Sequence, residues 1–204
     1  DADILVIEST YGRPDYVFPE QEEIEDKIID WVEDSDQPLF LFAYSLGKAQ
    51  RIQYLIEKAG KDRLYVHENI YNINEIYEKY LDFEFSAEKF RPDDFKEGVV
   101  VLPSNLSRSE KINDLIRRTD GIKAGFSGWA IKDSYEYRND LDVSFPFSDH
   151  CDFQDLIKIV ENVNPEKIYT FHGFSDRFAG ILRKKYGYNA VTLSGKQKNL
   201  EHFN

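Results

Sequence analysis

Short runs of hydrophobic residues alternate along the chain with longer stretches in which hydrophobic residues recur every three or four positions. This alternation predicts β-strands joined by α-helices. The expected strands are 3–8, 39–44, 64–67, 99–103, 122–127, 143–147, 167–171 and 190–193. The expected helices are 20–34, 48–59, 69–81, 108–118, 152–162 and 174–186, while 82–97 and 132–142 are expected to be loops or edge pieces.

The order of these elements predicts the fold class. The runs 39–44 and 99–103 are apolar without alternation, which is typical of parallel strands covered on both faces. Strands that alternate with helices form a right-handed, doubly wound, mostly parallel sheet, so we expect an α/β fold. Ligands bind such sheets at the carboxyl ends of the strands. The residues that follow each strand are therefore the candidate site.

Small, polar or ionisable residues follow six of the predicted strands. Those that we expect to contact a substrate are Ser9, Thr10, Tyr11, Ser45, Gly47, Lys48, Ser104, Asn105, Ser127 and Gly128. The segment from Ser45 to Gln50 is similar to a strand-to-helix anion cradle, but it lacks the spacing of a nucleotide-binding phosphate loop. A backbone contact to a substrate phosphate is still expected there.

Two of the four His residues stand at predicted strand ends. His150 precedes the helix 152–162, which Ser148 or Asp149 can cap, and the positive end of a helix favours anionic partners. His172 ends the strand 167–171, and a neutral imidazole is a good Zn²⁺ or Mn²⁺ ligand. Gly173 allows a tight turn after it.

Glu8 ends the first strand. Its carboxylate can accept hydrogen bonds from the amides of Ser9 and Thr10, or it can orient a nearby His. A structural role is possible for each of these residues taken alone. The placement of Glu8, His150 and His172 at predicted strand ends favours an active site. Cys151 has no Cys-x-x-Cys partner, and we expect a small buried residue rather than a nucleophile.

Composition and charge narrow the class of protein. The 204 residues are 41% hydrophobic and 15% aromatic, which predicts a globular chain. One Cys excludes a disulfide framework and favours a reducing, cytoplasmic setting, and no apolar run is long enough to span a membrane. The net charge of −12 opposes nucleic-acid binding unless the basic clusters, at Lys48 with Arg51, 108–118 and 177–185, line the site.

The sequence contains no Met, and it opens directly on the strand-like run from Ala2 to Ile7. A natural chain seldom begins inside a buried strand. We therefore expect residue 1 to be a cut point, with part of the gene product preceding it.

Four segments occur in an order that is typical of one family: Ile7 to Gly12, Tyr44 to Arg51, Phe147 to Asp152, and Phe171 to Gly173. Over nearly its whole length the chain resembles the metallo-β-lactamase-fold nucleases of the β-CASP group. It is most similar to the branch of DNA-ligase-associated exonucleases and mRNA 3′-end processing factors. The resemblance implies that 1–13 end a first metallo-β-lactamase segment, 14–142 form an inserted β-CASP domain, and 143–204 return to the αββα metallo-β-lactamase domain.

The resemblance also implies residue roles. Glu8 matches the carboxylate that positions a His, His150 matches the general acid that protonates the leaving oxygen, and His172 matches a ligand of one of two zinc ions. In the family these ions polarise the phosphate and supply hydroxide for in-line attack. The family's His-x-His-x-Asp-His motif, a further His and a bridging Asp precede the Glu8 strand and are absent here. We therefore expect this chain to bind zinc poorly and cleave nothing alone, and the full-length protein to hydrolyse phosphodiester bonds.

Several alternatives stay open for the substrate and the function. By resemblance, a His at the position of His172 is typical of RNA-processing members of the family, which favours RNA as the substrate. The similarity to the DNA-ligase-associated branch favours DNA repair instead. The expected partners are single-stranded RNA or DNA and a second copy of the chain, with no membrane. Bases would stack on Tyr11, Tyr44, Trp129 or Phe174, unless these are core residues.

Two further hypotheses are a non-catalytic β-CASP subunit and an unrelated doubly wound protein for small anions. The retained Glu8, His150 and His172 argue against the first. The second requires His150 and His172 to lie far apart.

Overall fold

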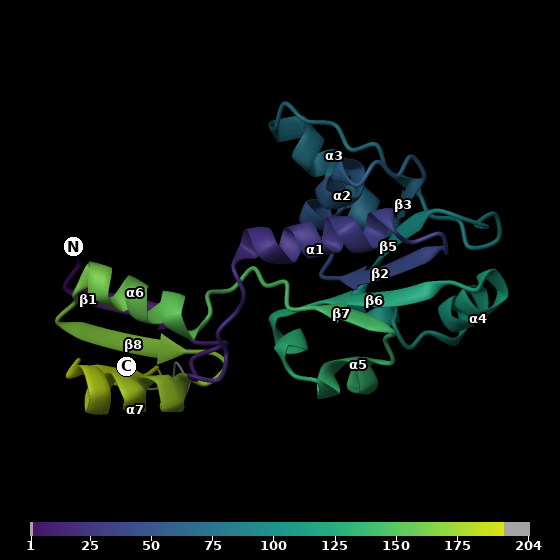
Figure 1. The fold of residues 1–204 in the computed structure, drawn as a ribbon. Helices are drawn as coiled ribbons and strands as arrows, with labels where there is room; N and C mark the ends of the chain where they lie inside the picture. Colours follow the sequence, from purple (N-terminus) through teal and green to yellow (C-terminus); the bar gives the residue numbers. More distant parts are fainter. Residues whose placement is uncertain (1, 194–204) are drawn as a thin grey trace, which may run out of the picture. The chain divides into compact units, whose positions relative to one another are not determined.

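The structure is a computed structural model that describes residues 2–193 (Figure 1). The described chain forms two compact units. Unit 1 consists of residues 2–17 and 150–193, and unit 2 consists of residues 18–149. Unit 2 is therefore an insertion between two sequence segments of unit 1.

Unit 2 is built around a parallel sheet of six strands, as far as the described residues go. The strands in spatial order are β4 (Glu88–Lys89), β3 (Leu64–Val66), β5 (Val99–Pro103), β2 (Leu39–Ala43), β6 (Ile122–Phe126) and β7 (Val143–Phe145). The central strand β2 pairs with β5 on one side and β6 on the other. The loops that follow these three strands are therefore neighbours at the carboxyl edge.

Helices cover both faces of this sheet. They are α1 (Gln21–Glu33), α2 (Lys48–Lys58), α3 (Glu68–Tyr80), α4 (Glu110–Thr119) and α5 (Ser134–Asn139), with short 3₁₀ turns η1 (Ser104–Leu106) and η2 (Gly128–Ile131). Leu39 and Leu41 of β2 pack with α1 and α2, whereas Phe40 and Phe42 pack with α4. The predicted doubly wound α/β architecture is confirmed.

Unit 1 contains a smaller parallel sheet in the order β1 (Ile4–Glu8), β8 (Lys167–Phe171) and β9 (Ala190–Thr192). The helices α6 (Phe153–Val163) and α7 (Ser175–Tyr186) pack on one face, where Ile7, Ile168 and Ala190 are buried. The opposite face carries hydrophobic side chains that are 36–58% exposed: Ile4, Val6, Phe171, Val191 and Leu193. Among residues 2–193, helices thus cover one face of this sheet only.

The structure differs from the sequence prediction at a few elements. The edge strand β4 and the helix α5 lie in segments expected to be loops or edge pieces. The strand expected at 143–147 ends at Phe145 and pairs with β6 in the sheet of unit 2. Asp152, and not Ser148 or Asp149, caps α6, because its side chain accepts a hydrogen bond from the amide of Asp155 at 2.8 Å.

Candidate active site

Glu8 stands at the carboxyl end of β1, where its side chain is tied to the next loop. Its Oε2 accepts a hydrogen bond from the backbone amide of Thr10 at 2.8 Å and another from the Thr10 hydroxyl at 2.5 Å. The prediction that the Glu8 carboxylate accepts a hydrogen bond from the following amides is therefore confirmed for the amide of Thr10. These two donors fix the orientation of the carboxylate.

The same carboxylate lies beside His150. The distance from His150 Nδ1 to Glu8 Oε2 is 3.5 Å, and that from Nδ1 to Thr10 Oγ1 is 3.4 Å. Since the Thr10 hydroxyl donates its proton to Glu8, its oxygen can accept from a protonated Nδ1. The ring of Tyr11 approaches the imidazole edge-on at 6.2 Å. Glu8 and Thr10 together therefore orient the His150 ring, as the hypothesis of an orienting carboxylate requires.

His150 does not gain this orientation from a helix end. The cap of α6 is Asp152, so His150 precedes the cap by two residues. The expectation that the α6 dipole acts on His150 through a cap at 148 or 149 is wrong. The loop after β1 positions the imidazole instead.

His172 is held against the same loop by its backbone. The Ser9 hydroxyl lies 2.9 Å from the carbonyl oxygen of Phe171 and 2.8 Å from that of His172. His172 and Gly173 both adopt left-handed backbone conformations, with φ of 59° and 57°. A Cβ on Gly173 would lie 2.3 Å from the Cα of Thr10, so only glycine fits this turn.

The ends of β1 and β8 thus converge on Ser9 and Thr10. Thr10 contacts His150 through its hydroxyl, and the turn that carries His172 packs on the backbone of Ser9 and Thr10. This convergence argues against the hypothesis of an unrelated anion-binding protein, which requires the two His residues to lie far apart.

The described residues do not by themselves make a metal site. Within 2–193, no group of three or more His, Cys, Asp or Glu side chains is arranged to hold an ion. Oε2 of Glu8 already accepts two hydrogen bonds from Thr10, and His172 offers a single exposed imidazole. One imidazole does not hold zinc, which takes three or four protein ligands.

Three predicted substrate contacts near this site are buried. Ser9, Thr10 and Tyr11 are each at most 5% exposed. Ser9 and Thr10 use their hydroxyls to tie the strand ends together, and the Tyr11 ring packs on Tyr16 at 5.4 Å. Their burial argues against direct substrate contact and gives them supporting roles.

Cys151 follows His150 and is half-buried. Burial raises the pKa of its thiol, and the carboxylates of Asp155, Glu8 and Asp152 raise it further. A thiol with a raised pKa is a weak nucleophile at neutral pH. This agrees with the expectation that Cys151 is not the reactive group.

The other predicted site residues gather at the carboxyl edge of the sheet of unit 2. Ser45, Gly47 and Lys48 follow β2, Ser104 and Asn105 follow β5, and Ser127 and Gly128 follow β6. Because β2 lies between β5 and β6, these three loops are adjacent. Tyr135 of α5 hydrogen bonds to Ser127, and burial raises the pKa of its phenol.

The loop after β2 has no free backbone amides at Gly47, Lys48 and Ala49 for the predicted anion contact. The amides of Gly47, Lys48 and Ala49 bond to Oε1 of Gln50 and to the carbonyls of Leu46 and Tyr44 at 2.7–3.0 Å. These amides are therefore already satisfied, and the expected backbone contact to a phosphate is not supported.

Lys48 is also turned inward. It is 2% exposed, and its Nζ lies 3.5 Å from Oδ2 of Asp149. Burial lowers the pKa of this ammonium, and the nearby Asp149 opposes that shift. Lys48 therefore supports the loop rather than reaching into solvent.

A buried cluster of amide side chains was missed from the sequence. Asn74 on α3 bonds to both Gln50 and Gln53 on α2, through contacts of 2.8–3.2 Å, and all three residues are buried. The signal was the i, i+3 spacing of Gln50 and Gln53, which places both amides on one side of α2. This cluster fixes the start of α2.

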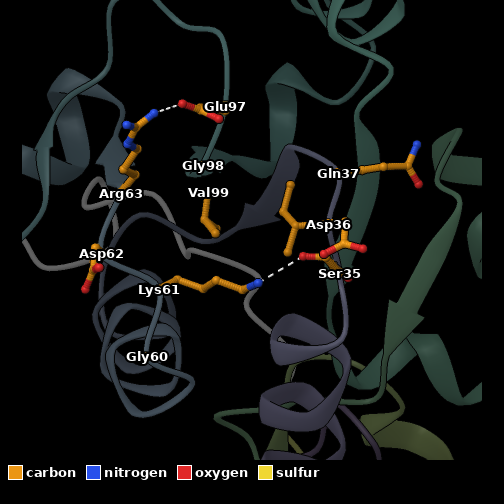
Figure 2. A pocket seen from close by; sticks show the side chains of 11 residues that line it. Ser35, Asp36, Gln37, Gly60, Lys61, Asp62, Arg63, Glu97, Gly98 and Val99 are labelled. Atoms are coloured by element: carbon orange, nitrogen blue, oxygen red, sulfur yellow. Dashed lines mark hydrogen bonds and ion pairs between the residues drawn. The ribbon is translucent and has the colours of Figure 1, made fainter.

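Figure 2 shows a cavity of about 410 Å³ at the opposite, amino edge of this sheet. Both of its basic side chains are engaged: Arg63 pairs with Glu97, and the Lys61 ammonium donates to the carbonyls of Glu33 and Ser35. The cavity is therefore held by internal pairs and stands apart from the predicted substrate-binding loops.

Comparison with known proteins adds two similarities. Residues 143–193 match the family described as "Zn-dependent metallo-hydrolase RNA specificity domain". A protein of Opitutus terrae named "Probable DNA ligase" is 34% identical over 207 residues, which cover 98% of this chain and 19% of that protein. The chain thus spans about a fifth of the length of this relative. None of the helices described is long and apolar enough to cross a membrane.

The residues of the candidate active site lie in the matched segment or contact it. The matched segment holds His150 and His172, and the convergence on Ser9 and Thr10 joins it to the segment that carries Glu8. The resemblance predicted from the sequence is confirmed at the level of the family. Residues 143–193 are therefore similar to the RNA specificity domain of Zn-dependent metallo-hydrolases, and this similarity agrees with the resemblance to β-CASP nucleases drawn from the sequence.

Proposed function

We propose that the whole protein hydrolyses phosphodiester bonds in single-stranded nucleic acid, and that this chain supplies its general acid. The observation that carries this proposal is the Glu8–Thr10–His150 arrangement, with Nδ1 of His150 3.4–3.5 Å from both partners. An imidazole that a carboxylate orients at a strand end is suited to proton transfer.

In this proposal each side chain has a separate task. The Thr10 hydroxyl donates to Glu8, and we propose that its oxygen accepts from the Nδ1–H of His150, 3.4 Å away. The second ring nitrogen, Nε2, then carries the transferable proton. The negative charge of Glu8 lies beside the protonated ring. Donation from Nε2 to the leaving oxygen of the scissile phosphate leaves a neutral imidazole that is still oriented by Thr10.

His172 is the candidate metal ligand. The matched family is described as Zn-dependent, and the turn at His172 is fixed by Ser9. We propose that His172 supplies one imidazole to a zinc site whose other ligands come from outside the described residues. Zinc bound there would supply the Lewis acid that the family description implies.

The uncovered face of the unit 1 sheet supports a larger catalytic domain. Its exposed hydrophobic side chains include Ile4 and Val6 on β1 and Val191 on β9. Hydrophobic sheet faces are stable when another layer covers them. We propose that a further layer of the whole protein packs on this face and completes the αββα domain, with unit 2 as the inserted β-CASP domain.

RNA is the preferred substrate in this proposal. The matched domain is described by its RNA specificity, and His172 is the residue that favours RNA by resemblance. The name of the relative, a probable DNA ligase, favours DNA instead. Cleavage of RNA and DNA strands of the same sequence by the whole protein decides between the two.

The test of the general acid is His150→Ala in the whole protein. We expect its kcat to fall by about 100-fold or more, while bound zinc, measured by elemental analysis, is unchanged. His67→Asn, which keeps a capping side chain at the start of α3, is the matched control and should retain full activity. Undiminished cleavage by the His150→Ala protein would remove His150 from the mechanism.

The positioning role of Thr10 needs its own pair of variants. Thr10→Val keeps the shape of the side chain but removes the hydroxyl that links Glu8 to His150, so kcat should fall by about 10-fold or more. Thr10→Ser keeps that hydroxyl and should restore most of the rate. Equal activity of the two variants would contradict the positioning role.

A further inference from the structure

We infer that Tyr44 is a base-stacking residue, which binds a nucleobase of the single strand at the carboxyl edge of the unit 2 sheet. This inference rests on the proposed function and adds a specific contact to it. The argument uses the exposure of the ring, the cation beside it and the rigidity of the loop that carries it.

Tyr44 has the position that a ligand-contacting residue needs. It follows β2, the central strand, so the loops after β5 and β6 flank it. Its side chain is 61% exposed, although β2 itself is fully buried. The phenol is near enough to Tyr135 to raise the pKa of that half-buried side chain. An aromatic ring is thus presented to solvent at the edge where doubly wound sheets bind ligands.

A fixed positive charge lies against this ring. Lys48 Nζ is 5.2 Å from the centroid of Tyr44, within the range of a cation–π interaction. Lys48 is buried, and its Nζ lies 3.5 Å from Oδ2 of Asp149, so the ammonium is held beside the ring by its own burial. The ammonium holds one part of the ring in place and leaves the exposed part for a base.

The loop under the ring is rigid because its hydrogen bonds are made internally. The Tyr44 carbonyl accepts from the amide of Ala49 at 3.0 Å, and the Ser45 carbonyl accepts from Nε2 of Gln50 at 3.2 Å. Gln50 is in turn held by Asn74 at 2.9 Å. A ring that is already ordered loses little conformational entropy when a base stacks on it.

Another exposed tyrosine provides a matched control. Tyr80 is 74% exposed, and Lys79 Nζ lies 5.5 Å from its ring centroid, as Lys48 does for Tyr44. Tyr80 is the last residue of α3, a helix that starts at the carboxyl edge of the sheet and runs back from it. It therefore offers the same chemistry away from the proposed binding edge.

The experiment measures equilibrium binding of two fluorescent strands to the whole protein by anisotropy. One is a short oligouridylate, and the other is an abasic strand with the same number of phosphates. Stacking predicts that Tyr44→Ala weakens oligouridylate binding by about fivefold or more and leaves the abasic strand unchanged. Tyr44→Phe keeps the ring and should bind within about twofold of wild type, and Tyr80→Ala should bind like wild type.

Each other outcome overturns the inference in a recognisable way. If the wild type binds and Tyr44→Ala binds equally well, the base does not contact this ring, while the proposed function stands. If Tyr44→Ala weakens both strands equally, the residue acts on the loop and not on the base. If the wild-type protein binds neither strand, the proposed function fails together with the inference.

Discussion

At the scale of single residues, Thr10 connects the parts of the candidate active site. Its hydroxyl donates to Glu8 and faces His150, while its Cα closes the space above Gly173. Ser9 holds the neighbouring strand end through two carbonyls. These hydrogen bonds explain how His172, which is not glycine, keeps a left-handed backbone that usually costs about 1–2 kcal/mol.

Cys151, the single cysteine of the sequence, allows a direct test of the site's charge environment. Burial and three nearby carboxylates raise the pKa of its thiol from the ordinary value of 9.0, so the folded chain carries less thiolate than the unfolded chain. We expect iodoacetamide to modify the native protein about 10-fold or more slowly at pH 8.5 than the urea-unfolded protein. Equal rates would contradict the assigned environment.

The sequence predicted the strand-end residues but not their burial. Glu8 and His172 follow from the rule that ligands bind at carboxyl ends of strands, because they stand at the ends of β1 and β8. The placement of His150 at a strand end is wrong, since β7 ends at Phe145, five residues before it. The burial of Tyr11 and Lys48 depends on contacts with residues distant in the sequence, such as Asp149 for Lys48. The local pattern of hydrophobic and polar residues gives no information about contacts between residues that are distant in the sequence.

At the scale of the structural elements, the turn after β8 is the most sensitive connection. Gly173→Ala puts a Cβ 2.3 Å from Thr10 Cα, and we expect a loss of unfolding free energy of about 3 kcal/mol or more. Gly187, which ends α7 with φ of 77°, has open space around it, and a Cβ added there would meet no atom within 4 Å. Gly187→Ala should therefore cost only about 1 kcal/mol.

Urea denaturation of the two glycine variants makes this comparison. Both sites lie in unit 1 and both have a left-handed backbone, so the difference isolates the steric contact with Thr10. Equal losses of stability in Gly173→Ala and Gly187→Ala would contradict the close packing of the two strand ends.

The contact between α2 and α3 gives a second prediction. Asn74→Ala removes the partner of Gln50 and Gln53 and leaves their buried amides without it, so we expect a loss of about 1–3 kcal/mol. Asn72 is exposed on the same helix, and Asn72→Ala should change the stability by less than about 0.5 kcal/mol. Urea unfolding of both variants tests this, and similar values would argue against the buried cluster.

The elements that the sequence predicted are those with a strong hydrophobic pattern. Strands 39–43 and 99–103 and helices 48–58 and 153–163 were found within a residue or two of their expected bounds, since their core residues set the period. Helix 134–139 was missed because it has no fully buried residue and so no apolar period. Strand 88–89 has only two residues, both exposed, and gives no alternation to detect.

At the scale of the whole molecule, unit 2 has the features of an independent folding unit. Residues 18–149 are continuous in sequence and hold a complete six-stranded sheet with hydrophobic cores on both faces. We expect a chain of residues 18–149 to unfold cooperatively in urea when followed by circular dichroism. A broad, non-cooperative transition would contradict this.

Unit 1 should behave differently when divided. A chain of residues 150–193 keeps β8 but loses β1, its parallel partner, together with the buried Ile7. We expect that chain to lack a cooperative transition and to regain one when a peptide of residues 2–17 is added. Cooperative unfolding of 150–193 alone would contradict the dependence on β1.

The parallel pairing of β1 with β8 has a consequence for synthesis on the ribosome. Ser9 and the carbonyl of His172 that it contacts are 163 positions apart, and all of unit 2 is translated between them. β1 therefore stays unpaired with β8 while unit 2 is synthesised and folds. Glu8 and His150 can meet only late in translation, so an incomplete nascent chain lacks the contact on which the proposed proton donor depends.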